Sequence, residues 1–184
     1  EKHTGTFGKI GVISFNGNKI LTTGGGGMML LMDEELGHKA KHLTTQAKVP
    51  HPWEFIHDEI GYNYRMPNIN AALGLAQMEQ LSSFLRSKRM IAEAYQNFFA
   101  TTHFTFICEP HHSHSNYWLN SVLLRDKEQR NAFLDYTNGN SIMTRPAWTL
   151  LNKLPMFRTC SKTDLINAKW IEERLVNLPS SVIS

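Results

Sequence analysis

The sequence lacks the features that mark disulfide-bonded, membrane-spanning and metal-binding proteins. It has two cysteines, Cys108 and Cys160, which form neither a metal-ligand spacing nor a disulfide framework. A reducing compartment is the simplest setting, so we expect a cytoplasmic protein. No apolar run approaches the roughly 20 residues that a bilayer-spanning helix needs. We therefore expect no membrane association.

Charge of one sign is also scarce. The chain carries 19 Lys and Arg residues against 16 Asp and Glu, for a net charge of +3, and they are spread along its length. The nearest approach to a basic block is the segment 86–89, on a predicted helix face. Nucleic acid is therefore not an expected partner. A hydrophobic content of 41% with 19% charged residues is that of an ordinary globular protein, and a mild positive charge suits an anionic small substrate.

What the chain does have is a lysine set close to a run of glycines. An apolar run over 10–15 leads to Lys19, four consecutive glycines occupy 24–27, and a second apolar run covers 28–32. The two runs predict short buried strands that flank a turn. Burying an ammonium is costly, but a lysine whose pKa is lowered becomes a nucleophile for Schiff-base chemistry with a carbonyl cofactor. Taken alone, such a lysine is more commonly a solvated surface residue.

A second motif follows the first. It begins with Gly-Tyr-Asn-Tyr-Arg at 61–65 and continues with Asn-Ala-Ala-Leu-Gly-Leu-Ala-Gln at 70–77. Together with the glycine run and with Ser14, five residues before Lys19, this text resembles the DegT/StrS-type family of nucleotide-sugar aminotransferases. Members of that family are fold-type-I pyridoxal-phosphate enzymes. The local sequence is most similar to the branch that aminates UDP-linked 4-keto-6-deoxy sugars.

The resemblance implies roles for individual residues near the lysine. Lys19 matches the lysine that forms the Schiff base with the cofactor and then moves the proton between cofactor and substrate. Ser14 matches a serine that hydrogen-bonds the cofactor phosphate. Asn63 matches an asparagine that reaches the phosphate from the other subunit of a homodimer, and Arg65 is a candidate for the same neighbourhood and for substrate binding. A hydroxyl, an amide and a guanidinium suit a dianionic phosphate.

Residues later in the chain are assigned to the substrate more loosely. The segment 116–118, which includes Tyr117, lies where the family's C-terminal domain approaches the substrate, and strand packing is an equal alternative. Arg145 with Trp148 is a candidate for binding the substrate diphosphate, or else the arginine belongs to a surface ion pair. The three histidines of 111–114 fit no standard metal spacing, so we predict a solvated or substrate-side loop and no metal site.

The sequence departs from the family pattern in two ways. The family usually carries Gly-Glu-Gly-Gly after the lysine, and here Gly25 takes the place of the glutamate. In the family, a glycine-rich segment, a ring-stacking aromatic residue and an aspartate that pairs with the ring nitrogen all precede the lysine. None of them is found in the residues before Ser14. We therefore expect this chain to be the C-terminal half of such an enzyme and to be inactive by itself.

The expected fold class is α/β, and the resemblance implies the C-terminal part of an aspartate-aminotransferase-like fold. Residues 1–84 would close the large cofactor-binding domain, 85–100 would form a connecting helix, and 101–184 would form a small α+β domain. The apolar pattern predicts strands over 8–15, 28–32 and 141–144, and helices over 33–44, 68–84 and 85–99.

The resemblance implies a pyridoxal-phosphate-dependent aminotransferase. Its amino donor would be glutamate, and the acceptor would be the C4 keto group of a nucleotide-linked 4-keto-6-deoxy sugar in surface polysaccharide synthesis. An alternative from another class is a non-catalytic module that only dimerises or binds a partner. A sugar dehydratase of the same family has a histidine in place of the lysine, and Lys19 argues against it. A phosphate-binding nucleotide loop is disfavoured because the glycines follow the lysine instead of preceding it.

Overall fold

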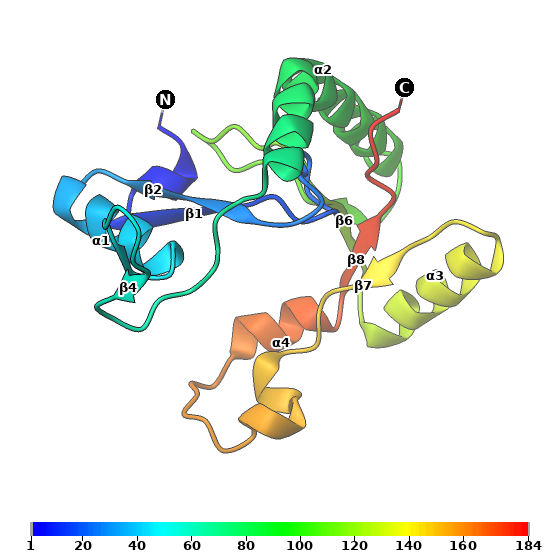
Figure 1. Ribbon diagram of the computed structural model, residues 1–184. Helices are drawn as coiled ribbons and strands as arrows, with labels where there is room; N and C mark the ends of the chain where they lie inside the picture. Colours follow the sequence, from blue (N-terminus) through cyan, green and yellow to red (C-terminus); the bar gives the residue numbers. More distant parts are fainter. Residues whose placement is uncertain (1, 184) are drawn as a thin grey trace. The chain divides into compact units, whose positions relative to one another are not determined.

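A computed structural model describes residues 2–183 (Figure 1). The chain divides into two compact units, with the boundary between Leu81 and Ser82. We call residues up to 81 unit 1 and residues from 82 unit 2, and describe each by itself. The mixture of helices and short strands agrees with the predicted α/β class. The predicted division into 1–84, 85–100 and 101–184 stays a prediction.

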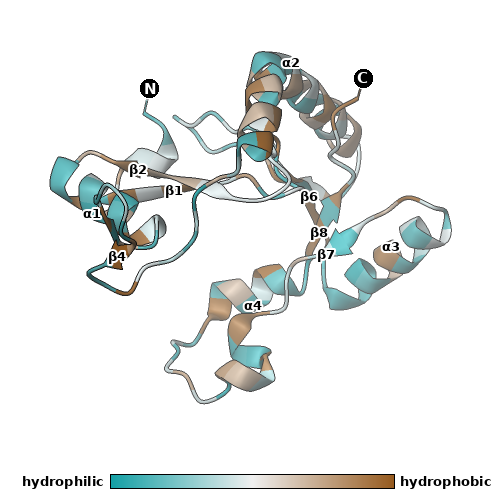
Figure 2. Cartoon of the chain, in the orientation of Figure 1, coloured by the Kyte–Doolittle hydropathy of each residue, from teal (hydrophilic) through white to brown (hydrophobic). Residues whose placement is uncertain are grey.

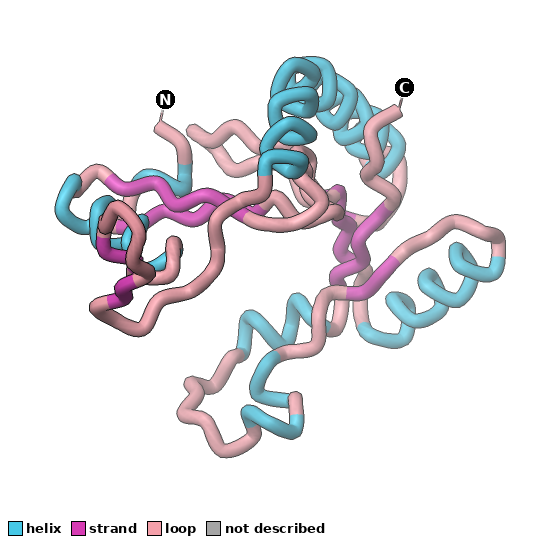
Figure 3. Tube along the Cα trace, viewed as in Figure 1, coloured by secondary structure: helices cyan, strands magenta, loops and turns pink. Residues whose placement is uncertain are grey.

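Unit 1 is built around an antiparallel ribbon of two strands. The strands are β1 (Ile10–Ser14) and β2 (Gly27–Leu31), and their register places Val12 opposite Met29. Before the ribbon comes a short 3-10 helix, η1 (Thr4–Thr6); after it come α1 (Glu34–Thr44), the small pair β3 (Lys48–Val49) and β4 (Ile56–His57), and the first part of α2 (Asn68–Phe99). Figure 3 shows that loop makes up most of the chain between β3 and α2. The positions of the two predicted strands are confirmed, but the expectation that they are buried is wrong, because Val12 and Met28 are 73% and 51% exposed.

The start of α1 is determined by a capping side chain. Asp33 has extended backbone angles, and its carboxylate accepts a hydrogen bond from the Leu36 N–H at 2.9 Å. Glu34 and Glu35 lie in the first turn, where negative charge is favoured by the helix dipole. The predicted helix over 33–44 is therefore confirmed almost to the residue.

The prediction of two helices over 68–84 and 85–99 is wrong. The structure has one helix, α2, which begins directly after Pro67 and continues without a break to Phe99. From Leu75 onward the helix contains no glycine or proline. Nothing in the sequence near residue 84 therefore removes a helical hydrogen bond or offers a left-handed stop.

Unit 2 contains a four-stranded antiparallel sheet. Its strand order is β5 (Thr105–Phe106), β6 (Asn120–Leu123), β8 (Leu175–Leu178) and β7 (Arg145–Pro146). The remaining elements of this unit are the second part of α2, α3 (Lys127–Gly139), α4 (Ile166–Glu172) and two 3-10 turns, η2 (Leu151–Lys153) and η3 (Pro155–Phe157). Unit 2 therefore has the mixed α+β character that the sequence predicts for this part of the chain.

The strand predicted over 141–144 is wrong by several residues. The chain first has to leave α3, and Ser141 does so with a left-handed φ of 62° while the Ile142 N–H bonds the Thr137 carbonyl at 2.9 Å. Strand pairing begins only at Arg145, which lies opposite Asn177 of β8. Residues 141 and 142, which belong to the predicted strand, thus form the turn that ends α3.

The hydrophobic core lies in unit 2. One cluster joins α2, β5, β6 and β8 and consists of Ala92, Phe99, Phe106, Tyr117, Val122, Leu124, Val176 and Leu178. Figure 2 shows these strands and the facing side of α2 by hydropathy. Within the described part of unit 1, Ala47 is the only apolar side chain that is buried. Among the described residues, no helix is both long and apolar enough to cross a membrane.

The end of the chain is attached to unit 2 by the buried side chain of Ser180. Its hydroxyl donates to the Leu178 carbonyl at 2.8 Å and accepts from the Asn120 backbone N–H, also at 2.8 Å. The amide nitrogen of the Asn120 side chain donates to the same oxygen at 3.2 Å. The buried ammonium of Lys88 donates to the Ser180 carbonyl, and burial lowers the pKa of that ammonium.

Replacing Ser180 by alanine is expected to destabilise unit 2. The change leaves two buried donors of Asn120 without a partner, at a cost of about 1–3 kcal/mol. Urea unfolding followed by tryptophan fluorescence measures this loss. The matched control is Ser181→Ala, because Ser181 is the next residue and is exposed. Equal unfolding midpoints for the two variants would contradict the assignment.

Candidate active site

Lys19 lies in the segment that joins β1 to β2, residues 16–26, which we call the lysine loop. Phe15 closes the base of this loop with both of its backbone groups. Its N–H donates to the Gly26 carbonyl at 3.0 Å, and its carbonyl accepts from the Thr23 N–H at 3.1 Å. The Thr22 hydroxyl donates to the same carbonyl at 3.0 Å. The two ends of the lysine loop are therefore held together at one residue.

The second sequence motif holds the lysine loop from α2. The Asn70 side-chain amide donates to the Thr23 carbonyl at 2.5 Å, and the Gln77 side chain accepts from the Thr22 N–H at 3.4 Å. Gly74 is buried between them, and a Cβ added there would lie 2.8 Å from the methyl carbon of Thr23. Gly74 is four residues after Asn70 and three before Gln77, so the three residues share one face of α2 and that face carries all three contacts.

Ser14 and Lys19 lie at the two ends of a tight turn. Ser14 ends β1, and its hydroxyl accepts a hydrogen bond from the Asn16 N–H at 3.4 Å. The Lys19 N–H donates to the Asn16 carbonyl at 3.0 Å, which closes the turn over 16–19. Lys19 is half-buried and Ser14 is exposed. The structure thus places a hydroxyl and an amine on the same short stretch of chain.

The four glycines after the lysine differ in their backbone conformation and in the space available for a side chain. Gly24 and Gly26 have φ values of 80° and 100°, in the left-handed region that favours glycine. Gly25 does not, and a Cβ added there would have no atom within 4 Å. Gly27 begins β2, where a Cβ would lie 2.7 Å from the Ile13 carbonyl oxygen. Position 25 is therefore the one place in the run where a side chain would meet neither a close contact nor a left-handed backbone.

The segment that carries Asn63 and Arg65 follows the end of α1. Tyr62 and Tyr64 donate their N–H groups to the carbonyls of Leu43 and Thr44, at 2.7 and 2.9 Å. Asn63 forms an isolated antiparallel bridge with Thr45. The side chains of Asn63 and Arg65 are exposed. This part of the chain therefore presents an amide and a guanidinium to solvent from a hydrogen-bonded backbone.

A charged cluster beside this segment was not expected from the sequence. The His42 ring bonds the Asp58 carboxylate at 2.6 Å and thereby lowers the pKa of Asp58, while Lys39 pairs with Glu59. The ligand atoms of His42, Asp58 and Glu59 lie within 4.8 Å of one another. Because the Lys39 ammonium already neutralises one of the two carboxylates, we assign this cluster to ion pairing. The histidine lies in α1 and the carboxylates lie in the loop before residue 60, and no sequence motif relates these two segments. The cluster could therefore not be predicted from the sequence.

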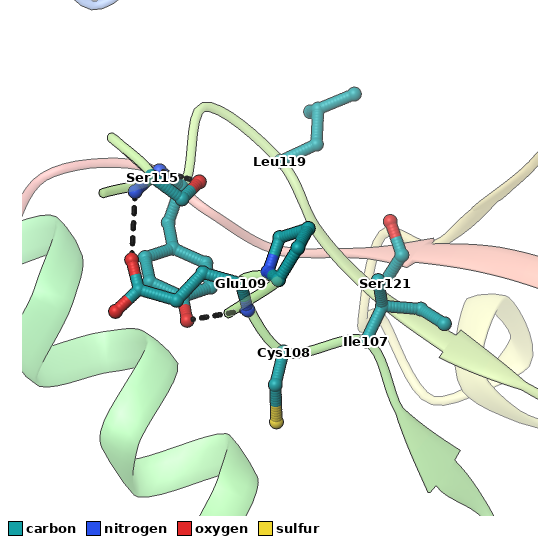
Figure 4. A pocket seen from close by; sticks show the side chains of 8 residues that line it. Ile107, Cys108, Glu109, Ser115, Leu119 and Ser121 are labelled. Carbon is teal, nitrogen blue, oxygen red and sulfur yellow. Dashed lines mark hydrogen bonds between the residues drawn. The ribbon is translucent and has the colours of Figure 1, made fainter. Parts of the chain in front are cut away.

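Tyr117 lies in the core of unit 2, and only 9% of it is exposed. Its backbone is left-handed, with φ at 45°, and its hydroxyl oxygen accepts the Glu109 backbone N–H at 3.2 Å. The Arg89 guanidinium lies 5.5 Å from the centre of its ring. Tyr117 lines a hollow of about 180 Å³ together with Cys108 and Ser121, and the last two are labelled in Figure 4.

An arginine–glutamate pair holds the loop that precedes Tyr117. Arg89 and Glu109 form two parallel hydrogen bonds of 2.8 and 3.0 Å. The Ser115 N–H donates to the same carboxylate at 2.7 Å (Figure 4). Hydrogen bonding from Arg89, followed by that from Ser115, lowers the pKa of Glu109 to about 2. The histidines of 111–114 are exposed on this loop.

Arg145 and Trp148 are both exposed and lie in and just after β7. Arg145 donates to the Thr144 carbonyl at 3.3 Å and to the Asn138 side chain at 3.4 Å. The ring of Trp148 stacks on that of Trp118, with 6.5 Å between their centres. Arg145 has no carboxylate partner among its hydrogen bonds within the described residues, so the surface ion pair considered from the sequence is not seen there.

Comparison with known proteins shows which family the chain belongs to. Residues 1–183 match the model of the DegT/DnrJ/EryC1/StrS aminotransferase family. The chain belongs to this family. It is 38% identical to the GDP-perosamine synthase of Escherichia coli O157:H7 over 97% of the chain and 48% of that protein. It is 39% identical to EpsN of Bacillus subtilis, named for pyridoxal phosphate-dependent aminotransferase activity, over 85% of the chain and 40% of that protein.

Solved structures show the same relationship. The aminotransferase TlmJ from Streptoalloteichus hindustanus superposes with a TM-score of 0.90 at 27% identity, over 98% of this chain and 49% of that one. Aminotransferases of this family use pyridoxal phosphate, and the predicted family, fold and cofactor class are confirmed. The chain spans about half the length of the curated relatives it matches.

The stability of unit 2 is expected to depend on pH through Glu109. Because its pKa falls from 4.5 to about 2 on folding, the carboxylate stabilises the folded state fully above pH 4.5 and loses this effect as the pH falls toward 2. Glu109→Gln should therefore unfold at lower urea concentration than the parent at neutral pH, and the difference should shrink between pH 4.5 and 2.

The control for this comparison is Asp164→Asn, an exposed acidic residue in a loop of the same unit. Its unfolding midpoint should follow that of the parent at every pH. A gap between Glu109→Gln and the parent that stays constant down to pH 2 would mean that the carboxylate charge has no part in holding the loop.

Proposed function

We propose that this chain supplies the catalytic lysine of a pyridoxal-phosphate-dependent sugar aminotransferase. One observation carries the proposal. Lys19 lies on a loop whose base is closed at Phe15, and Thr23 at that base packs against Gly74 of the second motif. The two motifs that define the family resemblance are thus in contact through Thr23 and Gly74, and Lys19 lies between Ser14 and the glycines in the sequence.

The residues present fit a phosphorylated pyridine cofactor by their chemistry. Ser14 offers a hydroxyl, Asn63 an amide and Arg65 a guanidinium, and each can bind a phosphate oxygen. The positive φ values of Gly24 and Gly26 let the backbone of the lysine loop approach a ligand where a Cβ would otherwise intervene. Pyridoxal phosphate, when bound, supplies the electron sink that amino-group transfer requires.

Within this proposal the chain's own groups have separate tasks. The Lys19 amine holds the cofactor and moves a proton to and from the reacting carbon as general acid and base. Ser14 and Asn63 orient the phosphate, Asn63 acting from the second subunit of a homodimer, with Arg65 beside it. Tyr117, Arg145 and Trp148 of unit 2 would bind the nucleotide-sugar substrate, Arg145 through its diphosphate.

The proposed substrates follow from the family and its relatives. Glutamate would donate the amino group, and the acceptor would be the C4 keto group of a nucleotide-linked 4-keto-6-deoxy sugar. The product would be a precursor of surface polysaccharides, made in the cytoplasm. The E. coli relative is named for a GDP-linked sugar, whereas the local sequence resembles the UDP branch. Assays should therefore offer both nucleotides with the same sugar class.

A non-catalytic role is the second candidate, and the coverage of the relatives favours it for the chain by itself. The chain spans about half of each of these curated relatives. The cofactor-binding residues that precede the lysine in the family are therefore not among the residues of this chain. We propose that the chain alone is inactive. Activity is therefore best tested in a chimera, in which the part of the E. coli synthase outside its match is joined to this chain.

The chimera is expected to carry its cofactor on Lys19. Reduction with borohydride in the presence of pyridoxal phosphate fixes the cofactor on the amine it occupies, and peptide mass spectrometry locates it. We expect the label on Lys19, and we expect Lys19→Ala to lose both the label and amino transfer. The control Lys9→Ala, at an exposed lysine before β1, should keep both. A folded chimera labelled equally at several lysines would contradict the proposal.

The glycine run offers a second test in the same chimera. Gly26→Ala should weaken cofactor binding about tenfold. An alanine at this positive φ raises the free energy of the loop conformation that binds the cofactor by roughly 1–2 kcal/mol. Gly25→Ala should leave binding within about twofold, since its φ is ordinary and its Cβ meets open space. Titration with pyridoxal phosphate measures both. Equal losses would mean that the loop backbone differs from the one described.

A further inference from the structure

Two consecutive residues between α1 and β3 have left-handed backbone angles although neither is glycine. Gln46 has a φ of 70° and Ala47 a φ of 49°, and Ala47 is completely buried. Such angles are uncommon for residues with a Cβ, and they persist where surrounding contacts hold them. We call this pair the left-handed turn. Its conformation therefore depends on the groups that bind it.

Hydrogen bonds hold every backbone polar group of the left-handed turn. The Gln46 N–H donates to the Tyr62 carbonyl at 3.0 Å, and the Ala47 N–H donates to the His42 carbonyl at 2.8 Å. The Ala47 carbonyl accepts a hydrogen bond from the Asp58 N–H at 3.3 Å. These three bonds join backbone groups, so they do not depend on which side chains the residues carry.

The fourth hydrogen bond comes from the side chain of His57, in β4. Nδ1 of this histidine lies 2.7 Å from the Gln46 carbonyl oxygen. A carbonyl oxygen only accepts hydrogen bonds, so Nδ1 carries the hydrogen and donates it. Of the four bonds, this one alone depends on the identity of a side chain. His57 is exposed, so its replacement removes no core packing.

The left-handed turn lies directly against the segment that carries Asn63. A Cβ added to Gly61 would lie 2.3 Å from the Gln46 carbonyl carbon and 2.4 Å from the Ala47 nitrogen, and both of these are backbone atoms. A glycine is therefore needed at position 61 for the two backbones to approach each other. Asn63 forms its antiparallel bridge with Thr45, the residue before the turn. The turn thus determines where the backbone of Asn63 lies.

We propose that His57 is a positioning residue for the cofactor phosphate. Its Nδ1–H holds the left-handed turn, and the turn holds the backbone from Gly61 to Asn63. Asn63 then presents its amide where it binds a phosphate oxygen, so His57 acts through Asn63 and not by contact with the cofactor. The inference rests on the proposed function at one point, the binding of phosphate by Asn63.

The test compares two ligands in the chimera, pyridoxal phosphate and pyridoxal, which lacks the phosphate. His57→Leu removes the donor and should weaken binding of pyridoxal phosphate about tenfold. Binding of pyridoxal should stay within about twofold, because the lysine loop is unchanged. Titration followed by absorbance measures both dissociation constants. A general loss of structure would instead weaken the binding of both ligands.

Two amide replacements separate the hydrogen bond from the shape of the ring. His57→Asn places an amide nitrogen close to the position of Nδ1, and it should bind pyridoxal phosphate within about threefold of the parent. His57→Gln places its amide one carbon farther from the backbone, and it should bind as weakly as His57→Leu.

The contact at Gly61 provides an independent variant. Gly61→Ala forces the two backbones apart and should weaken binding of pyridoxal phosphate at least about tenfold, with pyridoxal unaffected. The matched control is Gly37→Ala in α1, where an added Cβ has no atom within 4 Å. It should leave the binding of both ligands unchanged.

A double variant shows whether the effect passes through Asn63. Once Asn63→Ala is present, His57→Leu should cause no further loss of affinity for pyridoxal phosphate. Additive losses in the double variant would overturn the proposal, as would equal losses for the two ligands or a His57→Asn variant as weak as His57→Leu. A loss in Asn63→Ala with none in His57→Leu overturns this proposal alone. No loss in either variant overturns the phosphate role of Asn63 in the proposed function, and the role of His57 with it.

Discussion

The backbone of Phe15 is the constraint on which the candidate site depends. Its N–H and carbonyl bond opposite ends of the same segment, at Gly26 and Thr23, so the lysine loop leaves and re-enters the ribbon at one point. The positive φ at Gly26 turns the chain into β2 at that position. Lys19 and Ser14 then have their places set by backbone geometry, before any side chain contributes.

Side chains add a second level of order, and they act differently in the two units. In unit 1, Asn70 holds the lysine loop through the Thr23 carbonyl, and Gly74 lets the Thr23 side chain approach α2. In unit 2, Arg89 and Glu109 hold a loop by a charged pair, on top of a packed core. A charged pair on a packed core adds order to a structure that already exists, whereas the unit 1 contacts make up much of the order there.

The sequence was informative where one residue determines one feature. Asp33 predicted the start of α1, and the apolar runs around Lys19 predicted two strands, because helix capping and short apolar runs are local signals. The continuity of α2 and the late start of β7 were missed, because apolar residues near 84 and 142 suit several local structures. The contact of Gly74 with Thr23 joins residues 51 positions apart, and no local pattern specifies such a pairing.

The unequal distribution of the core has a consequence for the proposed chemistry. The lysine that would hold the cofactor lies in the unit that buries a single apolar side chain, whereas the candidate substrate residues lie in the unit that holds the core. A catalytic amine must be held within a fraction of an ångström of its productive position. If the order of the lysine loop depends on apolar cover over β1 and β2, then cofactor binding and the packing of these strands are thermodynamically linked. Apolar cover on β1 and β2 then contributes to the placement of Lys19 without any contact to the cofactor.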